Sequence, residues 1–265
     1  DGNRVFRYGD YPTYVKGSIA ILVESARKKI SKLVSKVSLK DFVATDDIRP
    51  AMTGVYHKDG YEYASDAMVL AKIKSEYPSE LEGMIISAKT GKEIDVKYPN
   101  ADDVIRGAID DNASELEISV DDIIANAQAI EDIKKRIGKG ATLYVRVGQD
   151  IFNTRNLLIA ASMAKQNGLT KVLQQKDKRA RAMAFVGDNG VVLVMPMTKN
   201  TDFNVLDASN GEITFDGSVL SALKVPATLK GIETARETLE VILPNLYRQT
   251  TEDLIGSEEI KLVDG

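Results

Sequence analysis

The chain has 265 residues, 43% of them hydrophobic, which is enough to bury one or two ordinary cores. Its formal net charge of -4 argues against a protein that coats nucleic acid indiscriminately, because that mode of binding needs a large positive surface; any contact with DNA must therefore be local. The chain has no Cys and one His, which excludes disulfides and thiolate chemistry and removes most transition-metal sites.

The apolar residues are mainly aliphatic, since only 6% of the chain is aromatic and there is no Trp. No apolar run approaches the roughly 18 to 20 residues that span a bilayer, and the first residues lack the apolar core of a signal peptide. We therefore expect a soluble, cytoplasmic protein with no membrane partner and a core of aliphatic side chains.

Apolar residues recur at helical spacing from Ile19 to Val37, which predicts one amphipathic helix. Lysines repeat every fourth residue on the opposite face, with one more beside them: Lys28, Lys29, Lys32 and Lys36. This stripe matches the spacing of a phosphate backbone, although a basic stripe opposite an apolar face is usually a solvated surface.

Two β units are expected next. The first is a hairpin from Met52 to Ile73 that turns at Asp59-Gly60. The second runs from Met84 to Val96 around Lys89-Thr90-Gly91, and Tyr98-Pro99-Asn100 then breaks the pattern.

The second half of the chain alternates between helices and strands. Ser119 reads as the N-cap of a helix that ends near Gly138, and a helix from Asn156 to Gln166 is stopped by Gly168. The predicted strands are Ala141–Val147, Ala182–Val186 and Val191–Pro196. After Lys199 the character changes: Asp207–Gly217 is turn-rich, Leu229–Leu243 is predicted to be a helix, and Tyr247–Gly265 is acidic.

The order of helix and strands recurs without a clean sequence repeat, and predicts an α+β fold with antiparallel sheets. We divide the chain into a first unit at residues 1–100 with the basic helix, a second unit at 101–200, and a C-terminal appendage at 201–265.

Three short motifs follow one another along the chain. The first pairs an Arg-Pro segment at Arg49–Val55 with a strand at Ala64–Ala71, the second is a Tyr-Pro element at Lys97–Ile105, and the third is a closing Met-Pro-Met strand at Val192–Met197. These motifs resemble those of the bacterial DNA sliding clamp, the beta subunit of DNA polymerase III, whose repeats pair an Arg-Pro-x-x-x-Gly-Val strand with an Ala-Thr-Asp-x-x-x-Leu-Ala strand. Two departures are Asp66-Ala67-Met68-Val69, where the family often has Asp-Gly-His-Arg, and Thr198, where it has Arg.

The resemblance implies repeats of helix plus antiparallel sheet, in a homo-oligomeric ring with helices on its inner wall. Such a ring holds a polymerase on duplex DNA by encirclement after a clamp loader has placed it there. Basic residues on the inner helices then need only weak, sequence-independent phosphate contacts. The candidate DNA-binding residues are Lys28, Lys29, Lys32, Lys36, Lys134, Lys135, Arg136, Lys139 and Arg155. Lys134 to Arg136 could equally complement a helix C-terminus.

In the same family, clients insert a short apolar peptide into a pocket partly lined by the closing strand. The corresponding residues are Leu193, Met195, Pro196 and Met197. Met suits such a pocket because its flexible thioether adapts to varied ligands. The alternative is that these are ordinary strand residues packed in a core.

The sequence offers little catalytic or cofactor chemistry. Four acidic doublets read as caps and solvated loops, because adjacent residues point to different faces: Asp46-Asp47, Asp102-Asp103, Asp110-Asp111 and Asp121-Asp122. His57 has no nucleophile or His partner nearby and is expected at the surface. The Gly138–Thr142 segment lacks the spacing of a phosphate loop.

We therefore predict a sliding-clamp-like processivity factor that is not an enzyme and binds neither metal nor cofactor. Two alternatives stay open. One is a small α+β hydrolase or transferase whose acids meet only in three dimensions, and the other is a clamp-fold interaction scaffold that does not encircle DNA.

Overall fold

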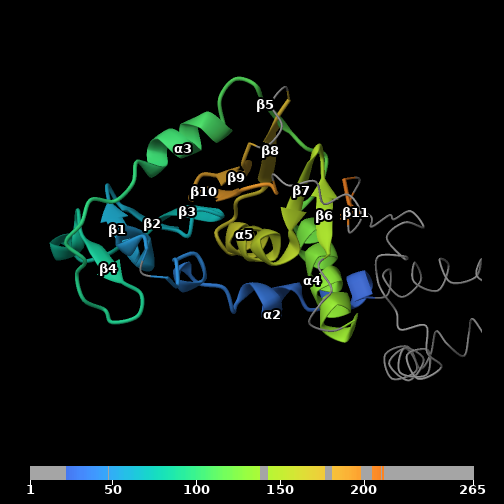
Figure 1. The fold of residues 1–265 in the computed structure, drawn as a ribbon. Helices are drawn as coiled ribbons and strands as arrows, with labels where there is room; N and C mark the ends of the chain where they lie inside the picture. The colour runs from blue at the N-terminus through green and yellow to red at the C-terminus, as the bar shows by residue number, and fades with distance from the viewer. Residues whose placement is uncertain are drawn as a thin grey trace, which may run out of the picture.

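A computed structural model describes residues 22–46, 48–137, 143–176, 181–197, 205–209 and 211 (Figure 1). Its helices are α2 (Ile30–Val34), α3 (Ala101–Ala108), α4 (Val120–Ile137) and α5 (Thr154–Gln166), preceded by a helical stretch at residues 22–27. Short 3-10 helices lie at Leu39–Asp41, Pro50–Thr53 and Ser79–Leu81. The strands are β1 (Gly54–Lys58), β2 (Tyr61–Ser65), β3 (Val69–Lys74), β4 (Ile85–Ser87), β5 (Ala113–Glu115), β6 (Tyr144–Val147), β7 (Asp150–Asn153), β8 (Lys171–Gln175), β9 (Met183–Gly187), β10 (Gly190–Val194) and β11 (Val205–Asp207).

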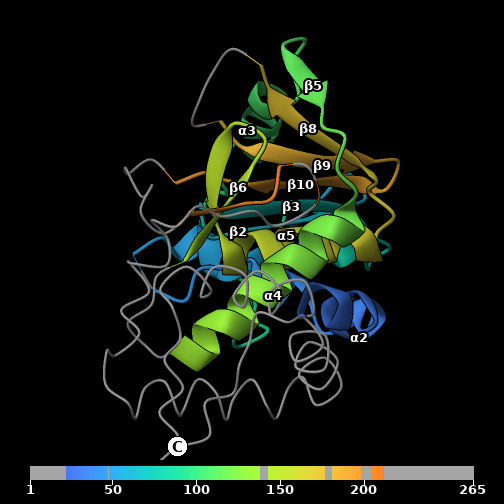
Figure 2. The same cartoon turned by 90° about the vertical axis from the view of Figure 1, so that its right-hand side faces the viewer.

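The predicted α+β class is confirmed. The main sheet of the described residues has eight strands in the order β4-β1-β2-β3-β10-β9-β8-β5, and its neighbours are antiparallel throughout. β3 and β10 lie side by side, with Leu70 opposite Leu193, so strands from the two ends of the described chain meet at the centre of the sheet. A smaller sheet, β11-β6-β7, pairs β11 with β6 in parallel. Figures 1 and 2 show α2, α4 and α5 on one face of the main sheet and α3 on the other.

The turn at Asp59-Gly60 is confirmed. Both residues have positive φ, 54° and 75°, which is the backbone of a two-residue hairpin turn. The predicted second strand of this hairpin is wrong, because the chain turns again between β2 and β3. There the Asp66 carboxylate accepts hydrogen bonds from the backbone N–H of Met68 (2.7 Å) and Val69 (2.9 Å), and Ala67 has a φ of 75°. The result is a three-stranded meander, since an Asp side chain can substitute for backbone partners in a turn.

The unit predicted from Met84 to Val96 forms one short strand, β4, and a single bridge between Ile86 and Glu93. Gly91 turns this loop with a φ of 69°. Helix α3 was not predicted, although acidic residues in its first turn and Arg106 in its last turn suit a helix dipole. The break at Tyr98-Pro99-Asn100 is therefore the start of a helix.

The predicted single helix from Ile19 to Val37 is wrong in its described part. Residues 22–27 are helical, residues 28 and 29 form a turn, and α2 begins at Ile30. Lys29 precedes α2 with φ -113° and ψ 6°, outside the helical region. Periodicity alone did not indicate this interruption, because the apolar face continues across it.

The remaining predicted helices and strands are close to those observed, whereas β5, β7, β8 and β11 were not predicted. Ser119 caps α4, as predicted, by accepting the backbone N–H of Asp122 at 3.1 Å. Helix α5 begins two residues earlier than expected, since the Asn153 side chain accepts hydrogen bonds from the N–H groups of Arg155 and Asn156. Gly168 ends it with a φ of 68°. β6, β9 and β10 lie within or beside their predicted ranges.

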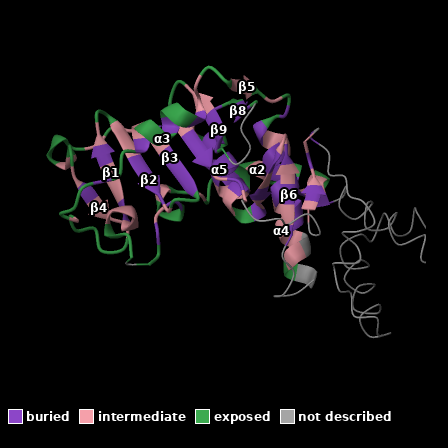
Figure 3. Ribbon diagram, turned by 45° about the horizontal axis from the view of Figure 1, so that its top comes forward, coloured by how far each residue is buried: buried purple, intermediate pink, exposed green. Residues whose placement is uncertain are grey.

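Two apolar cores lie on the two faces of the main sheet. The larger core joins the sheet to α4 and α5 and contains Val192 and Val194 of β10. The smaller core lies under α3 and contains Leu193, which alternates to the opposite face. In Figure 3 α3 carries exposed residues above the buried strands.

Residues 205–209 and Gly211 are part of this fold. β11 pairs with β6, and Leu206 and Ala208 are buried in the larger core. The side-chain amide of Asn126 on α4 donates to the carbonyl of Gly211 at 3.0 Å. These residues were assigned to the appendage, whose predicted helix and acidic end lie outside the described residues. Strands from both sides of residue 100 share the main sheet.

Candidate functional site

Acidic residues at the start of α4 link three helical segments. The Arg27 Nη2 lies 2.6 Å from Asp122 Oδ1, and the Lys165 Nζ lies 2.9 Å from Asp121 Oδ1. These pairs join residues 22–27 and α5 to the N-terminus of α4, where carboxylates are also favoured by the helix dipole. The reading of this doublet as a cap is confirmed by the Ser119–Asp122 hydrogen bonds.

The predicted lysine stripe is exposed in full but is divided by the turn at residues 28–29. Lys28, Lys29, Lys32 and Lys36 all have exposed side chains. Lys28 Nζ lies 3.4 Å from Glu24 Oε1, an exposed pair that adds little stability. The turn means that these ammonium groups do not follow one continuous helical face.

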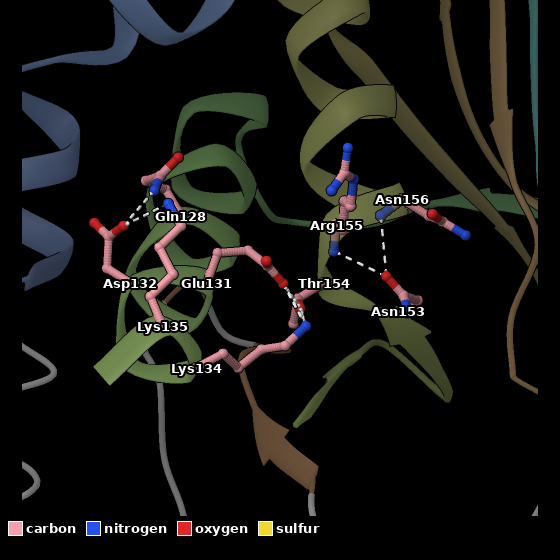
Figure 4. Close-up of polar contacts among 9 residues, drawn as sticks. All are labelled: Gln128, Glu131, Asp132, Lys134, Lys135, Asn153, Thr154, Arg155 and Asn156. Atoms are coloured by element: carbon pink, nitrogen blue, oxygen red, sulfur yellow. Dashed lines mark hydrogen bonds and ion pairs between the residues drawn. The ribbon is translucent and has the colours of Figure 1, made fainter. Parts of the chain in front are cut away.

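Lys134 is held inside a contact between α4 and α5 (Figure 4). Its Nζ lies 2.6 Å from Glu131 Oε1 and 3.1 Å from Thr154 Oγ1, and the Thr154 hydroxyl also donates to the Glu131 carboxylate. The Lys134 and Glu131 side chains are only 21% and 17% exposed, and Thr154 is fully buried. Lys134 therefore ties the two helices together.

Lys135 and Arg155 are exposed, in contrast to Lys134. Lys135 is 71% exposed, and its Nζ lies 3.5 Å from Asp132 Oδ1, which also accepts a hydrogen bond from Gln128 (Figure 4). Arg155 lies in the first turn of α5 with an exposed side chain. The side chain of Arg136 and all of Lys139 lie outside the described residues.

The closing strand connects the two sheets. The backbone N–H of Met195 donates to the Met68 carbonyl at 2.8 Å, and the N–H of Met197 donates to the Ile151 carbonyl on β7 at 2.7 Å. Pro196 is buried, whereas the side chains of Met195 and Met197 are half-buried.

Leu193 and Met68 change the predicted pocket lining. Leu193 is 1% exposed and packs in the core under α3, so its surface is not free in this conformation. Met68, which the sequence analysis named only as part of a departure from the family motif, is 39% exposed, and its carbonyl accepts a hydrogen bond from the N–H of Met195. The sequence showed only a Met beside a turn residue; that this Met lies next to Met195 follows from the pairing of β3 with β10.

An ion-pair cluster between the main sheet and the start of α3 was also missed. Lys72 Nζ lies 2.7 Å from Asp102 Oδ1 at the start of α3, and lies over the rings of Tyr61 (4.8 Å) and Tyr63 (5.2 Å). Tyr63 donates to Asp102 at 3.3 Å, and Lys58 Nζ is 3.9 Å from its second oxygen. These residues are far apart in the sequence, so no local pattern could join them.

Burial, hydrogen bonds and neighbouring charges together shift the pKa values in this cluster. Burial acts to raise the pKa of Asp102, but the hydrogen bond and positive charge of Lys72, with help from Tyr63 and Lys58, outweigh it and hold this pKa below its ordinary value. Burial acts to lower the pKa of Lys72, and its hydrogen bonds to Asp102 and Tyr63 raise it overall. Burial raises the pKa of Tyr63. The charged pair is thus stable across neutral pH.

The prediction that His57 lies at the surface is wrong. The residue is 5% exposed, with Nε2 3.3 Å from Glu62 Oε1, Nδ1 3.3 Å from the Met84 carbonyl, and its ring edge-on to Tyr77. The segment between β3 and β4 covers this side of β1, which a strand pattern alone could not indicate.

Within the described ranges, no three His, Cys, Asp or Glu side chains gather as a metal group, and no helix is long and apolar enough to cross a membrane.

Comparison with known proteins gives a match among solved structures. No protein-family model matches the chain, and no curated protein matches it. Similar structures include a putative DNA polymerase III beta subunit from Eubacterium rectale (12% identity, TM-score 0.45, 67% of this chain and 63% of that one). Others are the beta sliding clamp of C. crescentus (16%, 0.46, 66% and 64%) and the DNA polymerase sliding clamp of Bacillus subtilis (13%, 0.43, 66% and 63%). This chain thus matches just under two thirds of the length of each clamp, and these proteins are of the kind that its motifs resemble.

Proposed function

We propose that this chain is a sliding-clamp-like DNA replication processivity factor, which contacts duplex DNA without reading its sequence and tethers a polymerase. The observation that carries the proposal is the convergence of the motifs. β3 and β10, which hold the ends of two motifs, are paired at the centre of one sheet, and Tyr98 and Ile105 from a third motif pack in the core beside Leu70 and Leu193. Motifs separated by more than a hundred residues thus build one region.

The DNA-contacting part of the proposal rests on exposed cations of three helical segments. Lys28, Lys29, Lys32, Lys36, Lys135 and Arg155 have exposed side chains on residues 22–36, α4 and α5. Flexible ammonium groups make phosphate contacts that carry no sequence information, which suits a protein that must move along DNA. Lys134 is assigned a structural role because it is engaged with Glu131. Arg136 and Lys139 remain candidates from the sequence.

The partner pocket of the proposal is centred on Met68, Met195 and Met197. These Met side chains are partly exposed and lie on backbone segments that are hydrogen-bonded to one another or to β7. Flexible thioethers can adapt to several apolar client peptides. A polymerase and a clamp loader would compete for such a site.

Charge reversal tests the DNA contact. The triple variant Lys28→Glu, Lys32→Glu and Lys36→Glu is expected to lose most of its affinity for duplex DNA at low salt, because the loss of several phosphate contacts lowers affinity by orders of magnitude. A matched control reverses Lys89, Lys92 and Lys97, which are exposed around the β4 loop and change the net charge equally. Equal losses in both variants would remove the assignment to the helical face.

Two measurements test whether the protein encircles DNA. Light scattering coupled to size exclusion gives the mass of the assembly, and retention on closed-circular but not on linear DNA is expected for a closed ring. Monomers at all concentrations, together with equal retention on both DNA forms, would favour the interaction scaffold.

A further inference from the structure

The single His of the chain lies between two oxygen atoms inside the fold. His57 on β1 is 5% exposed; its Nε2 lies 3.3 Å from Glu62 Oε1 on β2, and its Nδ1 lies 3.3 Å from the carbonyl oxygen of Met84. A carboxylate and a carbonyl only accept hydrogen bonds, and a neutral imidazole has one N–H to donate, whereas an imidazolium has two. Both contacts are therefore hydrogen bonds only when both ring nitrogens are protonated. In the neutral ring one nitrogen lone pair would face an oxygen, with little room for water to intervene.

The Met84 carbonyl belongs to the end of a connector, residues 75–84, which joins β3 to the edge strand β4. The backbone N–H of Gly83 donates to the carbonyl of His57 at 2.8 Å, so the backbone of this residue holds the connector together with its side chain. The Tyr77 ring lies edge-on to the imidazole, with 5.0 Å between the ring centroids. The connector thus contacts His57 both at its middle and at its end.

The middle of the connector is also tied to the turn between β1 and β2. The Tyr77 hydroxyl accepts from the N–H of Gly60 at 3.0 Å and donates to Glu82 at 2.7 Å, and Glu82 accepts from the N–H of Asp59 at 3.0 Å. These hydrogen bonds hold the pKa of Glu82 below its ordinary value, and the charge of His57 acts in the same direction. They lie at the exposed surface, whereas the contacts of the imidazole are buried and gain more from a positive charge.

Acidic groups outnumber basic ones around the ring. The titratable groups of β2, the connector and the β1–β2 turn are Glu62, Glu76, Tyr77, Glu80, Glu82, Lys58 and Asp59. On the 3-10 helix Leu39–Asp41, which also packs against β1, Asp41 accepts a hydrogen bond from the N–H of Ser38 and Lys40 is exposed. An excess of carboxylates near an imidazole favours its charged form.

We propose that doubly protonated His57 is a latch that holds the connector between β3 and β4 closed, and that the connector opens when this proton is lost as pH rises. In the open connector the ring is hydrated and behaves as an ordinary histidine, which loses its proton near about pH 6.5. Because the closed connector binds the proton more tightly, the stabilisation by the latch is fully present below about pH 6.5 and is lost as pH rises above it. This device goes beyond the proposed function and requires neither DNA nor a client.

Nuclear magnetic resonance of the unsubstituted chain tests the protonation directly, because a single His gives an unambiguous signal. An ordinary histidine is about three quarters neutral at about pH 7. We expect both ring nitrogens of His57 to be protonated at this pH in two-bond proton–nitrogen spectra, while the urea-unfolded chain supplies the reference titration. A ring with one protonated nitrogen, or a titration that coincides with that of the unfolded chain, would overturn the latch.

Hydrogen exchange measures the opening of the connector. After correction for the intrinsic rate, the protection factor of the Gly83 amide should fall at least about tenfold between about pH 6 and about pH 8.5, since one proton changes the closed-to-open ratio by up to about tenfold per pH unit. The amides of β3 and β10 should keep their protection factors over this range. Equal protection of Gly83 at the two pH values would contradict the proposal.

A pair of variants assigns the effect to the buried contact. Glu62→Gln keeps the size of the side chain but removes the charge beside Nε2, and should lower the protection of the Gly83 amide about tenfold at about pH 6 and abolish most of its pH dependence. The matched control, Glu80→Gln, removes the same charge from an exposed side chain of the connector and should change neither quantity. The amides of β10 report whether each variant is folded. An equal effect of the two variants would overturn the latch, because net charge alone would then explain the opening.

Discussion

Replacing Tyr98 by Phe is expected to stabilise the protein. Tyr98 is 8% exposed, and its hydroxyl finds no hydrogen-bond partner in the described part of the chain. Burial raises its pKa, so the group stays protonated and uncharged at all ordinary pH values. A buried hydroxyl without a partner costs about 1–3 kcal/mol in lost hydration, while the ring keeps its stack on Tyr56 in the variant. We expect Tyr98→Phe to raise the free energy of unfolding by about 1 kcal/mol.

The matched control is Tyr63→Phe, on the same face of the sheet. Its hydroxyl donates to Asp102, so the same chemical change removes a hydrogen bond and should lower the free energy of unfolding by about 1 kcal/mol. Urea denaturation followed by circular dichroism measures both, with the slope unchanged if the surface exposed on unfolding is unchanged. Changes of opposite sign in the free energy of unfolding of the two variants would support the reasoning. A loss of stability in Tyr98→Phe as large as in Tyr63→Phe would refute it, since it would mean that the Tyr98 hydroxyl has a partner.

Three other predictions follow from the contacts. Because the pKa of Asp102 is depressed in the fold, its contribution to stability is present above the unfolded pKa of about 3.9 and is lost as pH falls through the folded pKa; acid titration of Lys72→Met should show a smaller loss. Lys134→Met should cost about 1–2 kcal/mol because the partly buried Glu131 carboxylate loses its ion-pair partner, although the Thr154 hydroxyl still donates to it, whereas Lys135→Met should change stability by less than about 0.5 kcal/mol in thermal unfolding. Ala67→Gly should raise stability by about 0.5 kcal/mol, because the φ of 75° strains a residue with a Cβ, and urea unfolding would detect a contrary loss.

The sequence predicted the elements whose determinants are local. The Asp59-Gly60 turn, the Ser119 cap and the Gly168 helix end each depend on residues within a few positions, and all three were confirmed. Two errors arose where the sequence pattern did not indicate an interruption of the element. The Asp66 carboxylate closes an extra turn, and the chain leaves the helical region at Lys29 although the apolar period continues.

The candidate site could be predicted only in part, because charge and burial depend on the tertiary structure. Lys134 and Lys135 are adjacent in the sequence and both are basic, yet one contacts Glu131 and Thr154 and the other is exposed. Nothing in the local pattern distinguishes them. The sequence likewise does not show whether Leu193 lines a pocket or packs in a core, because this depends on the position of α3 above it.

Successive side chains of β10 point alternately into the two cores on the two faces of the main sheet. Val192 and Val194 are buried against the large helices, where truncation would leave a cavity in the main core and should lower the stability of the whole fold. Leu193 faces the other core, in which Ile105 and two Ala residues of α3 are buried, and Met195 packs against that core. Since strand periodicity fixes which residues face which side, adjacent positions of one strand contribute to different cores. Truncation at position 192 or 194 therefore acts on the contact of the sheet with α4 and α5, whereas truncation at position 193 acts on its contact with α3.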